Sequence, residues 1–320
     1  MSALTGWQYR RLITINNSGN SNSLIDYQVV VTLDTQSLIS AGKMKGDGGD
    51  IRFTDSDGTT LLNYWVESGM NTSSTYIWVK VPSIPANSTK TIYLYYGNPS
   101  AISLSNDIAT FDYCDRGDQL SFWTVQPFSG QSEADGNPIP SYYSRPGSYM
   151  FRDINLTPPA VITFNIKTNA WGAFFFLVDS SGAGQMYRIS TSSHGYSGLG
   201  TTSSWTTVTN PSSGFYANAN VWYKLTIVIT DDTSATLYYS QTTDASPRSE
   251  TWGTQLGTYT ITNNGGYIGL RGGGTFPPSH ITLLDNIIVR KYTFPEPTIN
   301  IGPEEFLVIR TQRRLLISNY

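Results

Sequence analysis

The sequence of 320 residues has little charge, and this scarcity excludes nucleic acid as a partner. Lys, Arg, Asp and Glu make up 13% of the residues, where soluble domains usually have roughly 25%. The 20 Lys and Arg are balanced by 23 Asp and Glu, so the net charge is −3. The chain therefore lacks the basic surface that neutralises phosphates.

Cysteine and long apolar runs are scarce as well. Cys114 is the only cysteine, which excludes an intrachain disulfide and a multi-cysteine zinc site. No run of apolar residues is long enough to span a bilayer, and Met1–Trp7 lacks the apolar region of a signal peptide. We expect either a trimmed fragment or a protein that reaches the outside without a signal peptide, as virion proteins do.

Short β-strands are predicted from end to end. Hydrophobic residues reach 39% and aromatics 13%, enough to form packed cores. Runs rich in β-branched and aromatic residues, bounded by Gly, Asn, Ser and Pro, are typical of antiparallel sandwiches. In the first hundred residues they fall at 11–15, 27–33, 51–54, 61–66, 76–81 and 91–96. Further runs fall at 161–166, 173–178, 185–189, 222–229, 236–239, 267–270 and 286–290.

This pattern predicts an all-β protein of two antiparallel β-sandwiches in tandem. The first sandwich is placed at residues 1–100, a polar linker at 101–110, and a larger jelly roll at 111–296. Residues 297–320 are expected to form a C-terminal tail. Its apolar and basic segment, 304–320, is either a last strand packed on the second domain or an anchor that contacts other subunits.

Three stretches of the first domain resemble a known family. Trp7–Asn16, Gly49–Thr59 and Tyr93–Pro99 are similar to the domain of unknown function 2341, found in archaeal and bacterial surface proteins. In that family a concanavalin-A-like (laminin-G-like) sandwich often follows the module. Residues 111–292 resemble such a sandwich, through the segments 111–123, 222–227 and 284–290.

The concanavalin-like resemblance implies a structural calcium site. Many such modules hold Ca²⁺ between the entry segment and the last strand, and Asp112 and Asp285 occupy those positions. Carboxylate oxygens suit this ion. The alternative is that Asp112 caps a turn and Asp285 pairs locally.

Catalytic patterns are not found. The concanavalin-like fold includes both lectins and glycoside hydrolases, and the laminarinase-type enzymes place Glu-x-Asp-x-Glu on one strand. The nearest segment is Glu133-Ala-Asp135-Gly-Asn137, in which an amide stands at the second glutamate position and cannot protonate a leaving group. We therefore expect no enzymatic activity.

Loop aromatics are the best candidates for binding sugar, because a flat ring can cover the apolar face of a pyranose. Trp171, Trp205, Tyr216 and Trp252 lie in or beside Gly-, Ser- and Thr-rich segments. Each of them can instead be a core or rim residue.

These observations favour a non-catalytic extracellular recognition or adhesion protein. Its expected partners are a surface glycan or glycoprotein and, through residues 304–320, other subunits of an oligomer. We expect it on a cell surface or as a surface component of a virion or other assembly. The alternatives are a purely structural subunit of a filament, turret or surface layer, and a glycoside hydrolase or lyase whose carboxylates converge from different strands.

Overall fold

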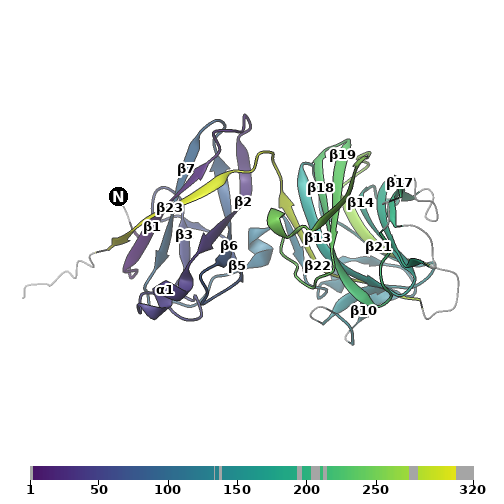
Figure 1. The fold of residues 1–320 in the computed structure, drawn as a ribbon, viewed down its shortest axis with the longest axis horizontal. Coiled ribbons are helices and arrows are strands. Elements are labelled where there is room, and N and C mark those ends of the chain that lie inside the picture. Colours follow the sequence, from purple (N-terminus) through teal and green to yellow (C-terminus); the bar gives the residue numbers. More distant parts are fainter. Residues whose placement is uncertain are drawn as a thin grey trace, which may run out of the picture. The chain divides into compact units, whose positions relative to one another are not determined.

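The computed structural model describes residues 3–132, 134–136, 139–192, 197–202, 210–211, 215–273 and 280–307. The chain forms two compact units (Figure 1). The first unit combines the chain up to Thr110 with the segment from Pro295 onward, and the second is Phe111–Phe294. Both are antiparallel β-sandwiches, so the predicted fold class is confirmed. The second sandwich is inserted into the first rather than simply following it.

The first unit pairs a five-stranded sheet with a three-stranded sheet. The larger sheet has the order β23-β1-β7-β3-β4 and the smaller one β2-β6-β5. Two short helices, α1 (Thr35–Ser40) and α2 (Asp107–Thr110), accompany them. The strands are β1 (Tyr9–Asn16), β2 (Leu24–Leu33), β3 (Arg52–Thr54), β4 (Leu61–Leu62), β5 (Tyr64–Ser68), β6 (Thr75–Ile84), β7 (Thr89–Tyr96) and β23 (Thr298–Phe306).

The C-terminal strand β23 completes the first unit. It pairs antiparallel with β1 over almost its whole length, from Tyr9 opposite Phe306 to Asn16 opposite Thr298, and Figure 1 shows the yellow β23 beside the purple β1. Ile299 and Ile301 pack against the core of this unit. The structure thus differs from the predicted tail at 297–320, because residues 298–306 belong to a sheet. Residues 308–320 lie outside the described part of the chain.

Residues 101–110 also belong to the first unit and are more than a linker. The Ser105 hydroxyl accepts a hydrogen bond from the Val66 amide at 2.8 Å, and the Asn106 amide donates to the Tyr64 carbonyl at 2.8 Å. The segment therefore packs along β5 before the chain enters the second unit.

The second unit consists of an eight-stranded and a seven-stranded sheet, the architecture predicted for a concanavalin-A-like jelly roll. The first has the order β10-β11-β22-β13-β18-β19-β20 with β8 beside β22, and the second β17-β16-β15-β14-β21-β12-β9. Among the residues that the structure describes, the 3₁₀ turns η1 (Leu120–Phe122) and η4 (Ser249–Thr251) lie in the connections. The strands are β8 (Tyr113–Asp115), β9 (Thr124–Val125), β10 (Ser129–Ser132), β11 (Ser141–Ser144), β12 (Tyr149–Asp153), β13 (Ala160–Thr168), β14 (Trp171–Val178), β15 (Gln185–Ser190), β16 (Gly198–Thr201), β17 (Asn210–Pro211), β18 (Val221–Asp231), β19 (Ser234–Ser240), β20 (Thr254–Thr260), β21 (Tyr267–Gly273) and β22 (Thr282–Lys291).

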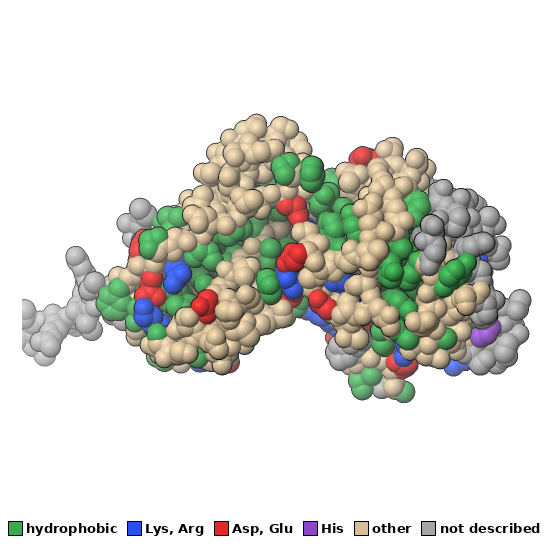
Figure 2. Space-filling view, viewed as in Figure 1, with side chains coloured by type: hydrophobic (Ala, Val, Ile, Leu, Met, Phe, Trp, Pro, Cys, Tyr) green, Lys and Arg blue, Asp and Glu red, His purple; other side chains and the backbone are tan. Residues whose placement is uncertain are grey.

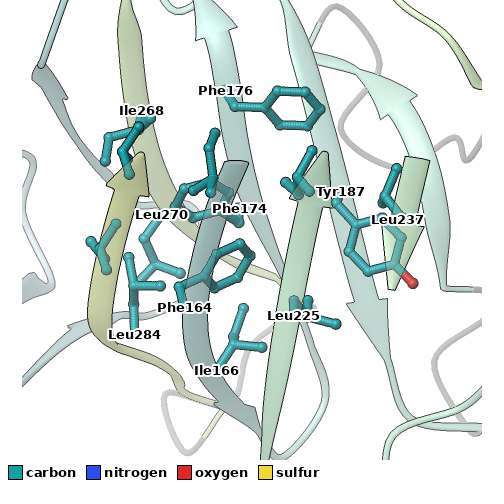
Figure 3. Close-up of a cluster of buried hydrophobic side chains, with 14 of the residues drawn as sticks. Phe164, Ile166, Phe174, Phe176, Tyr187, Leu225, Leu237, Ile268, Leu270 and Leu284 are labelled. Atoms are coloured by element: carbon teal, nitrogen blue, oxygen red, sulfur yellow. The ribbon is translucent and has the colours of Figure 1, made fainter. Parts of the chain in front are cut away.

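The core of the second unit lies between its two sheets (Figure 3). Phe164 of β13 and Phe174 of β14 come from opposite sheets, and their ring centroids are 4.0 Å apart. Leu225 and Leu237 join them from one sheet, and Ile268 and Leu270 from the other. Because side chains alternate along a strand, the neighbours of these residues must lie on the outer sides of the sheets.

The surface reflects the low charge of the sequence. On the face seen in Figure 2, charged side chains are few and scattered among apolar and neutral polar ones. Uncharged groups therefore make up much of this face.

A strained turn stands at the edge of the seven-stranded sheet. The Ser129 amide donates to the Gln126 carbonyl at 3.1 Å, so Pro127 and Phe128 are the central residues of a β-turn. Phe128 has a φ of +66° and is 66% exposed. The left-handed region costs a residue with a Cβ roughly 1–2 kcal/mol, and a turn with Pro at its first central position favours Gly at the second.

Replacing Phe128 with glycine is expected to raise the free energy of unfolding of the second unit by about 1 kcal/mol. The reason is that glycine adopts this φ without strain, while the exposed ring contributes little packing. Phe128→Ala is the matched control, since it removes the ring and keeps the strain. Urea unfolding measures the free energy of unfolding of both variants. The prediction is contradicted if the glycine variant is no more stable than the alanine variant.

Candidate functional site

The side of the seven-stranded sheet that faces away from the core carries a second cluster of side chains, which we call the outer face. Ala173 and Phe175 of β14 belong to this cluster, whereas their neighbours Phe174 and Phe176 point into the core. The other members of the cluster are Val178, Met186, Tyr149, Phe151 and Tyr267. Ala173, Phe175 and Met186 are buried, whereas Tyr149, Phe151 and Tyr267 are partly exposed and lie on the solvent side of the cluster.

Three of these aromatics form a continuous row, which we call the ladder. The ring centroids of Tyr149 and Phe151 are 5.9 Å apart, and those of Phe151 and Tyr267 are also 5.9 Å apart. Tyr149 and Phe151 are two residues apart on β12, and Tyr267 comes from the neighbouring strand β21. Such a row offers apolar ring surface with phenolic hydroxyls beside it.

Glycines in β21 let the larger rings of β14 lie across the sheet. A Cβ at Gly269 would come within 1.9 Å of the Phe175 ring, and one at Gly273 within 1.9 Å of the Trp171 ring. These positions exclude any other residue unless the rings move. The glycines therefore fix how the aromatic side chains rest on the outer face.

Two arginines share one lateral row of the outer face. Ala173 lies opposite Arg188 of β15 on one side and opposite Arg271 of β21 on the other, and Tyr149 lies opposite Arg271. The Arg188 guanidinium carbon is 4.5 Å from the centroid of the Trp171 ring. Burial lowers the pKa of both arginines, because it penalises their charged forms.

The predicted sugar-binding aromatics divide between this site and other places. Trp171 is on the outer face. Tyr216 is 38% exposed. It lies near Trp171, because the amide of the next residue, Ala217, donates to the carbonyl of Ser190, which is opposite Trp171 in the sheet. Trp205 lies outside the described residues.

Trp252 is a packing residue rather than a ligand platform. It is only 8% exposed and lies in a cluster with Val161 and Val228 of the other sheet. Its indole nitrogen donates to the Pro247 carbonyl at 3.3 Å. The structure thus corrects this prediction, because both the ring and the N–H of Trp252 are occupied within the protein.

The predicted calcium ligands do not come together. The exposed Asp112 is held beside Val289 by a bond from its amide to the Val289 carbonyl, whereas the Asp285 side chain is fully buried. Val289 and Asp285 are four residues apart on β22, with an irregularity at Asn286 between them, which corresponds to on the order of 10 Å. Within the described residues no three His, Cys, Asp or Glu side chains form a group that could hold a metal ion. These two residues therefore do not fit one Ca²⁺ ion.

Asp115, which sequence reasoning missed, organises the entry segment instead. Its fully buried carboxylate accepts hydrogen bonds from the hydroxyls of Tyr113 and Tyr142, each at 2.7 Å, and from the Trp123 indole at 3.1 Å. Burial raises the pKa of both tyrosines, and the negative charge of Asp115 raises it further. Because the residue is sealed from solvent, its role is structural.

The three stretches with a family resemblance meet at one place in the first unit. The Trp7 indole donates to the Asp50 carbonyl at 2.7 Å, and the Asp50 carboxylate accepts the Gly97 amide at 2.7 Å. The Arg52 guanidinium lies 5.3 Å from the Trp7 ring and donates to the Gly49 and Ile102 carbonyls. Asp50 and Arg52 are both buried, so these motifs stabilise the fold of the unit.

The resemblance to the family is confirmed. A family model described as a domain of unknown function (DUF2341) matches residues 47–126. It includes the second and third of the predicted stretches and extends to the start of the second unit.

A viral protein is similar to part of the chain. Uncharacterized protein 562 of Sulfolobus islandicus rod-shaped virus 1 is 37% identical over 89 residues, which are 27% of this chain and 15% of that protein. The chain thus spans a small part of the length of this relative.

Several solved structures resemble the chain more distantly. The binding domain of botulinum neurotoxin serotype D is 10% identical over 57% of this chain and 49% of its own, with a TM-score of 0.34. Domain 4 of an arabinanase from Geobacillus stearothermophilus, in complex with arabinotriose, is 12% identical over 53% of this chain and 82% of its own, with a TM-score of 0.31. Endo-β-1,4-glucuronan lyase from Trichoderma reesei is 13% identical over 58% of this chain and 92% of its own, with a TM-score of 0.31. Likenesses this distant concern the fold alone.

Proposed function

We propose that the chain is a non-catalytic recognition protein that binds glycans through the outer face of its second unit. The observation that supports this most strongly is the ladder of Tyr149, Phe151 and Tyr267. Partly exposed rings in a row can stack on successive sugar units, while neighbouring polar groups bind the hydroxyls.

The arrangement of carboxylates supports binding without cleavage. Glycoside hydrolysis needs two carboxyl groups flanking the scissile bond, about 5–9.5 Å apart. On the ladder strands Asp153, opposite Tyr267, accepts the Asn155 amide at 2.9 Å. Asp135, from the hydrolase-like segment, pairs with Lys167 at 2.6 Å, and Glu133 and Asn137 lie outside the described residues.

An extracellular position on a virion or comparable assembly completes the proposal. It is supported by the similarity to a protein of a rod-shaped virus and by the small share of charged residues, 13%. Among the described residues, none of the helices has the length and apolar character needed to cross a membrane.

Alanine replacements in the ladder test the site. We expect the full-length protein to bind members of a glycan array, and Tyr149→Ala or Tyr267→Ala to weaken this binding about 5- to 10-fold through loss of ring stacking. Tyr238→Ala is the matched control, because Tyr238 is a partly exposed tyrosine of β19, in the eight-stranded sheet, where it packs on Trp252. Uniformly negative arrays would contradict the proposal, and release of reducing sugar from a bound polysaccharide would show that the protein is an enzyme.

A structural subunit is the second candidate, and the exposed turn at 126–129 favours it. Phe128, in this turn, is 66% exposed, and an exposed apolar side chain can take part in a subunit contact. This reading predicts self-association that Phe128→Ala weakens, as measured by analytical ultracentrifugation. A monomer at all concentrations would exclude a contact between copies through this turn.

Residues 304–307, the start of the segment predicted to contact other subunits, also make contacts within the first unit. Glu304 pairs with Lys43 at 2.5 Å and accepts the Tyr96 hydroxyl at 2.7 Å, and the Leu307 amide bonds to the Gln8 carbonyl. Anchoring by residues 308–320 stays a prediction. Its test is deletion of those residues alone, which spares β23.

A further inference from the structure

We propose that the glycan bound by the ladder is acidic, and that Arg271 pairs with its carboxylate or sulfate groups while Arg188 adds positive charge to the same row. This inference rests on the proposed function and names the class of its ligand.

The register of the strands places these two cations together. Arg188 and Arg271 both lie opposite Ala173, so their Cα atoms are two strands apart, about 10 Å. The residue between them has only a methyl side chain, which puts no bulky group between the two guanidinium groups. Because guanidinium groups remain protonated at neutral pH, the row holds two positive charges.

Burial raises the free energy of the charged forms of both arginines, and an anion bound beside them would lower it. Arg188 is 7% exposed, and burial lowers the pKa of both arginines. Two like charges in a partly buried row also repel each other more strongly than they would in water. In a chain with only 13% charged residues, two arginines on one aromatic face therefore favour an anionic ligand.

The ladder begins beside the cations. Tyr149 is directly opposite Arg271, and the ladder continues from there to Phe151 and Tyr267. The exposed carboxylate of Asp153 is at the far end, opposite Tyr267 and four residues along β12 from Tyr149, about 13 Å away. A sugar stacked on Tyr149 would thus place an acidic substituent near Arg271 and away from Asp153.

Arg271 is the more exposed of the two arginines. It is partly exposed beside the ladder, where a planar guanidinium can form bidentate bonds with a carboxylate or sulfate.

The test compares polymers that differ only in charge. Binding of the full-length protein to polygalacturonate is measured against its methyl ester, and binding to dextran sulfate against dextran, at low and high salt. We expect at least one acidic polymer to bind about tenfold more tightly than its neutral partner, with the preference lost at high salt. The two pairs show whether carboxylate or sulfate is recognised.

Variants then assign the preference to the row. Arg271→Gln is expected to abolish it, Arg188→Gln to reduce it, and Arg271→Lys to keep part of it. Lys80→Gln is the control, because Lys80 is a partly exposed cation on β6 of the first unit, whereas the outer face belongs to the second. If a variant fails to fold, the salt dependence of the acidic preference in the unmodified protein still tests whether the ligand is acidic.

The possible outcomes separate the two proposals. Equal binding of acidic and neutral polymers would overturn the acidic ligand and leave glycan binding intact. An acidic preference that survives in Arg271→Gln would overturn the assignment to this row. Absence of binding to every polymer, together with a negative glycan array, would overturn both proposals.

Discussion

Replacing Asp115 with alanine is expected to lower the free energy of unfolding of the second unit by about 3 to 5 kcal/mol. The carboxylate accepts bonds from Tyr113, Tyr142 and Trp123, and all three side chains are buried. Without it, their donors lose their acceptor in a place that water does not reach. The nearby Arg152, 3.6 Å from the carboxylate, also loses its counter-charge.

Asp112→Ala is the control for this prediction. Asp112 is an exposed aspartate three residues earlier in the same entry segment, so its replacement should change stability by less than about 0.5 kcal/mol. Urea unfolding followed by hydrogen exchange of peptides from each unit would assign the effect to the second unit. Equal losses in the two variants would contradict the central role of Asp115.

Deleting residues 298–320 is expected to destabilise the first unit by at least about 3 kcal/mol and to promote association. The deletion removes the strand next to β1, the packing of Ile299 and Ile301, and the acceptor of the Tyr96 hydroxyl. It also exposes the edge of β1 to other chains.

The control deletion removes only residues 308–320 and leaves β23 in place. It should keep the stability of the first unit unchanged within error. Calorimetry and light scattering of the two truncated proteins would measure both effects. If the longer deletion melted and scattered like the shorter one, β23 would not be an integral part of the first sandwich.

Sequence reasoning predicted the strands well because their signal is local. The runs at 91–96 and 222–229 match β7 (Thr89–Tyr96) and β18 (Val221–Asp231), since β-branched and aromatic residues bounded by turns need no distant information. The placement of β23 could not be obtained in this way. Its partner β1 is at the other end of the chain, and nothing within residues 298–306 identifies it.

The candidate site was predictable only in part, because it depends on strand register. Trp171 was found from its glycine-rich surroundings, but the same rule also selected Trp252, which packs against the other sheet. Tyr149 and Phe151 show an alternation that marks one face of a strand. That this face points away from the core, and that Arg271 lies beside it, follows only from the pairing of β12 with β21.

The insertion of one sandwich into the other bears on the order in which the chain folds. During synthesis β1 emerges before the second unit and β23 after it, so the first unit is incomplete until the second unit has been made. The second unit is continuous in sequence, and its opening and closing strands, β8 and β22, are paired neighbours. Once it has folded, it replaces a flexible loop of almost two hundred residues by a short connection, which lowers the entropy cost of joining β1 to β23. The folded second unit is therefore expected to favour the pairing of β1 with β23, in addition to carrying the outer face.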